Sequence, residues 1–483
     1  MRPVRRAALV TLAMVNVATL AAGIAVARML PPRLAALRIP VAAARPVVTA
    51  TPVLPAVTRP SQPGPASSAL AALIRADLPS DKVGSPIGVA VADAATGKLL
   101  YAENADSLAT PASTTKVATA TAALAVLGPR ARFATSVRNA PGGGIVLVGG
   151  GDPTLAVRPY PATDLPQPAT LAALAESTAR ALKGAGRTSV RLGYDTSLYQ
   201  GPLMAPGWTG RLVQTGNVTP VVALEVDQGR LTASGAPEDS DDPVNYSPRT
   251  TDPAGMAANA FAALLRADGI NLSGAPAQET AAKGAAAIAS VSSPPLADIV
   301  GQMLQESNNV IAENLGRHLA IALGLPATFS GAASAVPAEL RRLGVTTPIR
   351  LVDTSGLSPR DGIAPATLVR VLEIAAGTAP RTPPAAARAR AAVTGLPVAG
   401  FSGTLSAGQS VFGGIGGAAR GVVRAKTGNL DTVATLAGLV TDKSGRLLVF
   451  ALMAPRIPRS YLLKPAANAI DSAAAGLAGC GCG

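Results

Sequence analysis

Residues 111–121 read PASTTKVATAT, and the interpretation of the whole chain starts from them. Ser113 precedes Lys116 by three positions, at the head of an Ala-rich run that predicts a helix. On a helix these two side chains lie one turn apart on the same face and can touch. A neutral amine beside a serine hydroxyl can take its proton and make it a nucleophile. Alone, however, Ser-x-x-Lys is short, common and more typical of a plain helix start.

Two later stretches carry the residue types that this chemistry needs. Residues 306–309 read ESNN between two predicted helices, and residues 424–429 read RAKTGN at the end of a predicted strand. Separately, the first is typical of a capping loop and the second of a strand end. In this order after Ser113 and Lys116, they complete the penicillin-recognising set Ser-x-x-Lys, Ser-x-Asn, Lys-Thr-Gly. We therefore expect one active site assembled from three distant segments.

The composition limits the other kinds of site. A chain of 483 residues exceeds what one hydrophobic core supports, so at least two domains are expected. The single histidine, His318, lies in a predicted amphipathic helix, and both cysteines are at the C-terminal end. This argues against a His/Cys zinc site and against a Cys-His pair. We predict no metal and no cofactor, and a lysine or a carboxylate as the catalytic base.

The chain carries a formal net charge of +14. Such a surplus favours contact with polyanions, including an anionic cell envelope. Nucleic acid is not predicted as a partner, because there is no Lys/Arg cluster with interleaved aromatic residues.

Residues 1–30 predict export. Three arginines precede an uncharged, apolar run at 7–27, which is the pattern of a secretory signal. Residues 25–27 offer a small-x-small cleavage site, yet the run is also long enough to span a bilayer. A signal peptide and a retained membrane anchor both remain open. In either case we expect a periplasmic or other extracytoplasmic location, with the Pro-rich stretch 31–66 as an extended linker.

The folded part is predicted in three pieces and a tail. Residues 67–154 begin a first domain, with a helix at 70–78, a hairpin at 87–102 and a strand at 145–148. Residues 155–285 are predicted to form an inserted region with helices at 171–182 and 254–268 and a strand at 221–227. Residues 286–472 complete the first domain with helices at 296–305, 310–323, 337–343 and 364–376 and three final strands. A last helix near 463–477 is expected to pack on that sheet. Residues 473–483 are predicted as a tail, whose Cys480 and Cys482 form a disulfide or stay as thiols.

From about residue 67 to 455 the chain resembles the class-C low-molecular-mass penicillin-binding proteins. These are the D-alanyl-D-alanine carboxypeptidase/endopeptidases of the penicillin-binding protein 4 type. Besides the three motifs, the similar stretches are 149–155, 353–358 and 396–400. The long separation of Lys116 from Ser307 also fits this group. The resemblance implies an α+β fold: a penicillin-recognising serine transpeptidase-like domain, an antiparallel sheet with flanking helices, into which an α/β-type region is inserted.

The resemblance also implies acyl transfer on peptidoglycan stem peptides, with β-lactams as covalent inhibitors. Ser113 is implied as the nucleophile, Lys116 as the base and Ser307 as the proton relay to the leaving amine. The implied substrate-binding residues are Asn309, Lys426, Thr427, Gly428 and Asn429, and the backbone N–H groups of Ser113 and Asn429 are implied as the oxyanion hole.

A pocket for the substrate side chain is implied for the inserted region, with Asp195 and Leu430 as candidates. For Asp195, a turn-forming role after a strand is an equal alternative. The sequence departs from the group at Ser402 and at Asn308, where aspartate is usual. We expect an exported serine D,D-carboxypeptidase, with D,D-endopeptidase activity as an option. The alternatives are a catalytically silent wall-binding scaffold, disfavoured by the intact motifs, and a β-lactamase, disfavoured by the insertion.

Overall fold

The computed structural model describes residues 66–161, 166–231, 247–378, 384–408 and 419–480, together with residues 410, 412 and 417. The expected signal or anchor at 1–30, nearly all of the linker at 31–66, and Cys482 lie outside the described residues. Within the described part of the chain, no helix is both long enough and apolar enough to cross a membrane.

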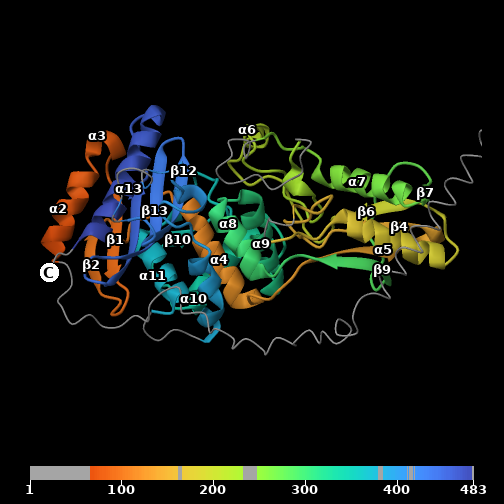
Figure 1. Ribbon diagram of the computed structural model, residues 1–483, viewed down its shortest axis with the longest axis horizontal. Helices are drawn as coiled ribbons and strands as arrows, with labels where there is room; N and C mark the ends of the chain where they lie inside the picture. The colour runs from red at the N-terminus through yellow and green to blue at the C-terminus, as the bar shows by residue number, and fades with distance from the viewer. Residues whose placement is uncertain are drawn as a thin grey trace, which may run out of the picture. The chain divides into compact units, whose positions relative to one another are not determined.

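Twelve helices are described along these residues (Figure 1). They are α2 (Ser67–Asp77), α3 (Ser80–Val83), α4 (Thr115–Leu127), α5 (Leu171–Gly184), α6 (Gly210–Gln214), α7 (Pro253–Ala267), α8 (Leu296–Gln305), α9 (Asn309–Ala322), α10 (Phe329–Arg342), α11 (Pro365–Ala376), α12 (Ala391–Thr394) and α13 (Leu463–Gly479).

The strands described there follow the same chain order. They are β1 (Gly88–Asp93), β2 (Leu99–Glu103), β3 (Ala134–Asn139), β4 (Ile145–Val148), β5 (Ser189–Val190), β6 (Leu192–Asp195), β7 (Asn271–Leu272), β8 (Ala277–Gln278), β9 (Ala287–Ser292), β10 (Ile349–Arg350), β11 (Gly362–Ile363), β12 (Val423–Leu430), β13 (Val433–Thr441) and β14 (Leu447–Ala454).

The main sheet has the strand order β12-β13-β14-β1-β2 and is antiparallel throughout. Strands β1 and β2 come from the start of the folded chain and β12, β13 and β14 from its end. The two parts join where β1 pairs with β14, with Gly88 opposite Met453. Helices α13 and α2 pack together on one face, and α11 packs against β1 and β14 (Figure 1). The predicted α+β domain with an antiparallel sheet and flanking helices is therefore confirmed.

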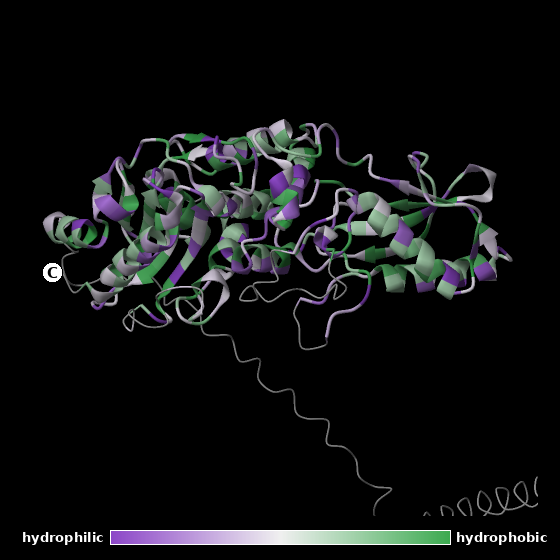
Figure 2. Cartoon of the chain, turned by 90° about the horizontal axis from the view of Figure 1, so that it is seen from above, coloured by the Kyte–Doolittle hydropathy of each residue, from purple (hydrophilic) through white to green (hydrophobic). Residues whose placement is uncertain are grey.

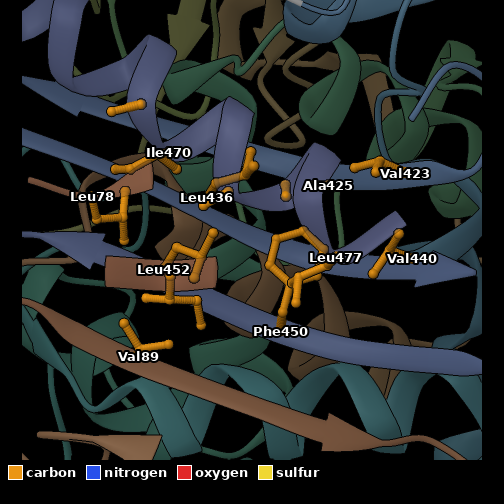
Figure 3. Packing of buried hydrophobic residues seen from close by; sticks show 14 of the residues in the cluster. Leu78, Val89, Val423, Ala425, Leu436, Val440, Phe450, Leu452, Ile470 and Leu477 are labelled. Carbon is orange, nitrogen blue, oxygen red and sulfur yellow. The ribbon is translucent and has the colours of Figure 1, made fainter. Parts of the chain in front are cut away.

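Aliphatic residues fill the space between this sheet and α13. Leu436, Phe450 and Leu452 of the sheet meet Ile470 and Leu477 of the helix (Figure 3). Each such side chain contributes about 1.5–3 kcal/mol when it is fully buried. Figure 2 shows the same concentration of hydrophobic residues along the strands. Because aromatic residues make up only 3% of the chain, the core consists mainly of Ala, Val, Leu and Ile.

A second sheet, of order β8-β6-β4-β3-β9, forms the inserted region. Strands β4, β6 and β8 run parallel, and the chain passes through α5 and α7 between them. This confirms an α/β-type insertion, but its boundaries need correction. Strands β3 and β4 were assigned to the first domain at 67–154, yet they pair with β6 and β9 in this sheet. Ala134 pairs with Ser292, so the insertion starts and ends at this antiparallel pair.

Two further assignments are wrong for physical reasons. The predicted tail at 473–483 begins inside α13, which continues to Gly479 because Ala473, Ala474 and Leu477 are buried with helical spacing. The strand predicted at 221–227 does not form. Its apolar side chains are buried, but its backbone bonds to separate loops, as in the bond from Val221 N to Leu203 O.

An irregular part of the insertion packs directly against the main domain. Tyr199, Trp208 and Val218 share one hydrophobic cluster with Val310 of α9 and Phe329 of α10. This cluster fixes the adjoining turn, residues 216–217, beside the N-terminus of α9. The insertion is thereby brought into contact with the segment that carries the second motif.

Candidate active site

Ser113 and Lys116 meet as their helical spacing predicts. Ser113 lies in the short 3₁₀ turn η2 (Ala112–Thr114), and α4 follows without a break. Ala112 has a φ of 48°, in the left-handed region that non-glycine residues rarely adopt. One turn later, Lys116 is fully buried, and its Nζ lies 2.8 Å from Oγ of Ser113.

Lys116 has two further partners, both carbonyl oxygens. Its Nζ donates to Oδ1 of Asn309 at 2.6 Å and to the backbone oxygen of Ser355 at 2.8 Å. Burial lowers the pKa of Lys116 to about 7, and the negative charges of Asp353 and Glu313 oppose this shift. About half of the lysine is therefore uncharged at neutral pH.

The second motif forms the sharp turn between α8 and α9. Ser307 has a φ of 56°, so this turn also stores backbone strain of order 1–3 kcal/mol. Asn308 caps α9 by accepting the N–H of Ile311 at 3.1 Å, and its amide donates to Oε1 of Gln228 at 2.7 Å. An aspartate could cap the helix but could not make the second bond, so asparagine ties this turn to the insertion.

Asn309 is held from both ends of its amide. Its Oδ1 faces Lys116, and its Nδ2 donates to the backbone oxygen of Asn217 at 2.8 Å. Asn217 follows Gly216, whose carbonyl oxygen accepts from Nε of Arg249 at 3.1 Å. The insertion therefore determines which way the amide of Asn309 points.

The third motif lies on β12, pressed against the Ser113 turn. Thr435 of β13 donates its hydroxyl to the oxygen of Pro111 at 2.8 Å. A Cβ on Gly428 would lie 2.3 Å from that hydroxyl and 3.0 Å from the nitrogen of Ser113. Only glycine lets the strand approach this closely.

The side chain of Lys426 is buried, whereas that of Thr427 lines the cleft. Lys426 is fully buried and donates to the oxygen of Thr427 at 2.9 Å; burial and the charge of Lys116 hold its pKa well below the usual range. Thr427 donates its hydroxyl to that of Thr404 at 2.8 Å. The turn before Thr404 is fixed by Ser402, whose Oγ accepts the N–H of Val398 at 3.1 Å. Serine thus supplies an acceptor where aspartate is usual.

A cleft of about 660 Å³ unites these segments. From the three motifs, its lining includes Ser113, Ser307, Asn309, Thr427 and Asn429. Lys116, Lys426 and Gly428 lie behind that surface and support it.

The two candidates for a side-chain pocket are not among the described residues that line the cleft. Asp195 is 5% exposed, and its two oxygens accept the N–H groups of Ser197 at 2.7 Å and Ala281 at 2.8 Å. This is the turn-forming alternative. Leu430 is the last residue of β12 and pairs with Val433.

Four residues at or beside the site were missed from the sequence: Asn217, Glu313, Asp353 and Thr404. A signal for one of them exists, because Glu313 follows Asn309 by four positions and so shares its helix face. Asp353 begins the DTSGLS stretch but was given no role there. Nothing in the sequence pointed to Asn217.

The sequence profile of the D-Ala-D-Ala carboxypeptidase 3 (S13) family matches residues 70–248 and 230–475. The chain belongs to this family. It is 38% identical to Carboxypeptidase DacB of Mycolicibacterium smegmatis over 426 residues, 88% of this chain and 86% of that protein. A carboxypeptidase of Mycobacterium tuberculosis is 35% identical over 457 residues, 93% of this chain and 91% of that relative.

The fold agrees with this S13 assignment. The crystal structure of penicillin binding protein 4 from Haemophilus influenzae matches with a TM-score of 0.63 at 24% identity, over 80% of this chain and 92% of that one. The predicted penicillin-binding protein 4 type and serine D-Ala-D-Ala carboxypeptidase are thus confirmed, and neither the silent scaffold nor the β-lactamase is favoured. Membership of a cell-wall enzyme family also indicates action outside the cytoplasm.

Proposed function

We propose that this S13 enzyme works through an acyl-enzyme on Ser113, with Lys116 as the general base. The contact of Nζ with Oγ at 2.8 Å supports this most directly. A neutral amine has two N–H groups and one lone pair. The carbonyl oxygens of Asn309 and Ser355 accept both N–H groups, so the lone pair is left for the hydroxyl of Ser113.

The proposed acylation conserves every proton. Oγ of Ser113 bonds to the carbonyl carbon of the penultimate D-Ala while its proton passes to Nζ of Lys116. The C–N bond then breaks, and the leaving D-Ala amine receives a proton relayed through Ser307, which lines the same cleft. Water attacks the ester in the second half-reaction and frees Ser113.

The developing oxyanion is proposed to bind the N–H groups of Ser113 and Asn429. The close approach of Gly428 to the nitrogen of Ser113 supports this placement, because Asn429 is the next residue of the strand. Such donors are worth about 2.7–4 kcal/mol each. The hydroxyls of Thr427 and Thr404 face the cleft and suit the terminal carboxylate, with the charge of Lys426 behind them.

Peptidoglycan stem peptides are the proposed substrates and β-lactams the proposed inhibitors. The relative from Haemophilus influenzae has a structure in complex with a β-lactam. In this chain we expect a β-lactam to acylate Ser113. D,D-endopeptidase activity is proposed as an additional reaction, because a cleft of about 660 Å³ also admits leaving amines larger than D-Ala. Residues 1–30 are proposed to export the enzyme, as a cleaved signal or as an anchor.

Labelling of the purified protein with a fluorescent penicillin tests this proposal, beside D-Ala release from a peptide ending in D-Ala-D-Ala. A stable adduct and D-Ala release are expected from the wild type. Both should be lost in Ser113→Ala and kept in Ser197→Ala, a change at an exposed serine. An adduct that persists in Ser113→Ala would exclude the proposed nucleophile. Rapid loss of the label with hydrolysed drug would favour a β-lactamase.

A further inference from the structure

The backbone oxygen that accepts from Lys116 belongs to a buried loop, residues 353–356. The oxygen of Thr354 accepts the hydroxyl of Thr119, one turn beyond Lys116 on α4, at 2.7 Å. Gly356 has a φ of 84°, and a Cβ there would lie 1.9 Å from the oxygen of Ala112. The loop is therefore packed against the same helix and turn that carry the nucleophile and the base. A small shift of the loop would move the oxygen of Ser355 relative to Nζ.

Glu313 holds this loop from the opposite side. It lies on α9, one turn after Asn309, and is fully buried. Its carboxylate accepts the N–H of Ser355 at 2.8 Å, the N–H of Thr354 at 3.1 Å and the hydroxyl of Thr354 at 2.9 Å. Ser355 thus donates its N–H to Glu313, and its carbonyl oxygen accepts from Lys116.

The contacts of Glu313 favour its ionised form. The two N–H groups can only donate, and a carboxylate accepts from them without a proton of its own. The hydroxyl of Thr354 also lies 3.1 Å from the oxygen of Ala312, and it donates to one of the two acceptors at a time. Burial and the negative charge of Asp353 raise the pKa of Glu313 to about 7, and these donors oppose the shift. Above neutral pH the residue therefore carries a negative charge close behind the base.

The other charged groups around Lys116 are few among the described residues. Asp353 accepts from Gly356 N and Ser358 N at 2.7 Å each and from Nε1 of Trp208 at 2.8 Å, again donors only. Burial and the charge of Asp353 raise the pKa of the neighbouring Asp361 to about 10, which favours its protonated form at neutral pH. Lys426 faces Lys116 from β12 as a like charge.

We propose that Glu313 is a positioning residue for the general base. It holds the carbonyl of Ser355 against Nζ of Lys116. Its negative charge also stabilises the protonated form of that amine. This inference rests on the proposed role of Lys116 as base. Helix α9 would then support Lys116 in two ways. Asn309 contacts its Nζ directly, and Glu313 holds the loop 353–356 that supplies the carbonyl of Ser355.

The test compares Glu313→Gln, which removes the charge, with Glu313→Asp, which keeps it. The second-order rate of acylation by a fluorescent penicillin is followed between about pH 5 and pH 10, where the base titrates. In Glu313→Gln the acidic limb of the pH–rate profile should move to lower pH by about one unit. The reason is that protonated Lys116 loses the negative charge of Glu313 that stabilises it. Its plateau rate should fall about tenfold, as the carbonyl of Ser355 is held less firmly. Glu313→Asp should keep the wild-type limb and part of the rate.

Glu339→Gln is the matched control, since Glu339 is also a buried glutamate but lies on α10 and pairs with Arg342. It should leave the limb unmoved. A folded Glu313→Gln enzyme with a wild-type limb would overturn the proposal. If that variant does not fold, Thr354→Val is measured instead, because it removes one hydrogen-bond donor to Glu313 and no charge. Its acylation should be about threefold slower, which corresponds to about 0.65 kcal/mol. An unchanged rate would overturn the proposal. Should Lys116→Ala acylate at the wild-type rate, the base assignment itself fails, which is a separate result.

Discussion

Oδ1 of Asn309 lies 2.6 Å from Nζ of Lys116, although 193 positions separate the two residues along the chain. The same amide donates through Nδ2 to Asn217 of the inserted region. Exchanging oxygen and nitrogen in this amide would break both bonds, so its orientation is fixed by its neighbours. The inserted region, which carries none of the three motifs, therefore sets the orientation of the amide that contacts Lys116.

Asn309→Asp tests this arrangement. Aspartate cannot donate to Asn217, and its negative charge beside Nζ should raise the pKa of Lys116. The acidic limb of the pH–rate profile of acylation should move to higher pH by about 1–3 units, so the rate at neutral pH falls at least about fivefold. Penicillin acylation as a function of pH is the measurement, with Asn271→Asp on an exposed strand position as control. A limb that stays in place would show that Asn309 does not contact the amine in solution.

The titration of Lys116 should determine how the acylation rate of the wild type depends on pH. With a pKa of about 7, the amine is protonated below that value and can accept the serine proton only above it. Acylation should therefore rise as pH increases through 7 and level off at alkaline pH. Lys116→Ala should lose about 100- to 10,000-fold and show no limb near pH 7. Stopped-flow acylation at saturating drug would measure this; a limb that persists in the variant would assign it to another group.

Most of the site was predictable from the sequence because its motifs are local. Ser113 and Lys116 share a helix face, and Thr427 and Asn429 share a strand, so short spacings are enough to identify them. The contribution of Asn217 depends on an irregular turn held by Trp208 and its neighbours, which no periodic pattern reports. For Asp195 the sequence left a pocket residue and a turn-forming aspartate equally open, and its bonds to Ser197 and Ala281 are those of a turn-forming aspartate.

The helices were more predictable than the sheets. The range 296–305 was predicted for α8 and is observed, since its amphipathic spacing and the preceding prolines define it. For α10 the predicted range was 337–343, whereas the helix starts at Phe329 and contains Pro337 in its interior. Strand β4 was found at 145–148, but its sheet was not, because pairing with β6 is set by tertiary packing.

Thr427→Val tests the proposed carboxylate site. Valine keeps the shape of threonine but removes the hydroxyl that bonds to Thr404 and faces the cleft. Loss of a hydrogen bond to a charged group should cost about 1.5–3 kcal/mol, so kcat/KM for a D-Ala-D-Ala peptide should fall about 10- to 150-fold. An otherwise identical peptide with a C-terminal amide is the control. If the variant discriminates between acid and amide as well as the wild type, the carboxylate binds elsewhere.

Gly428→Ala should damage the site by forcing strand and turn apart, although it removes no catalytic group. The new Cβ would meet Thr435 Oγ1 at 2.3 Å and the oxygen of Pro111 at 2.8 Å, so β12 must move away from the Ser113 turn. Such overpacking costs about 1–3 kcal/mol and should also slow acylation. Thermal unfolding and penicillin labelling measure the two effects. Gly301→Ala, on α8 with open space at its Cβ, should be neutral or stabilising, and equal behaviour of both variants would contradict the packing described here.

A buried ion pair joins the first and last parts of the chain and should contribute to stability. Asp93 ends β1, and its carboxylate pairs with Arg446, which precedes β14; both side chains are buried. Burial raises the pKa of Asp93, but Arg446 and Thr96 outweigh it, so the net pKa lies below the usual value. Asp93→Asn leaves a buried guanidinium without its carboxylate and should lower the free energy of unfolding by about 3–5 kcal/mol near neutral pH.

The sign of the pH dependence follows from that lowered pKa. The carboxylate stabilises the folded state above its unfolded pKa, about 3.9, and this contribution is lost as pH falls through the lower folded value. The gap between wild type and Asp93→Asn should therefore be full at about pH 6 and shrink below about pH 4. Chemical denaturation at several pH values measures it. Glu176→Gln, which breaks the exposed pair with Arg180, should cost no more than about 1 kcal/mol. A gap at Asp93 as small as that of the surface pair would mean that water reaches the buried pair.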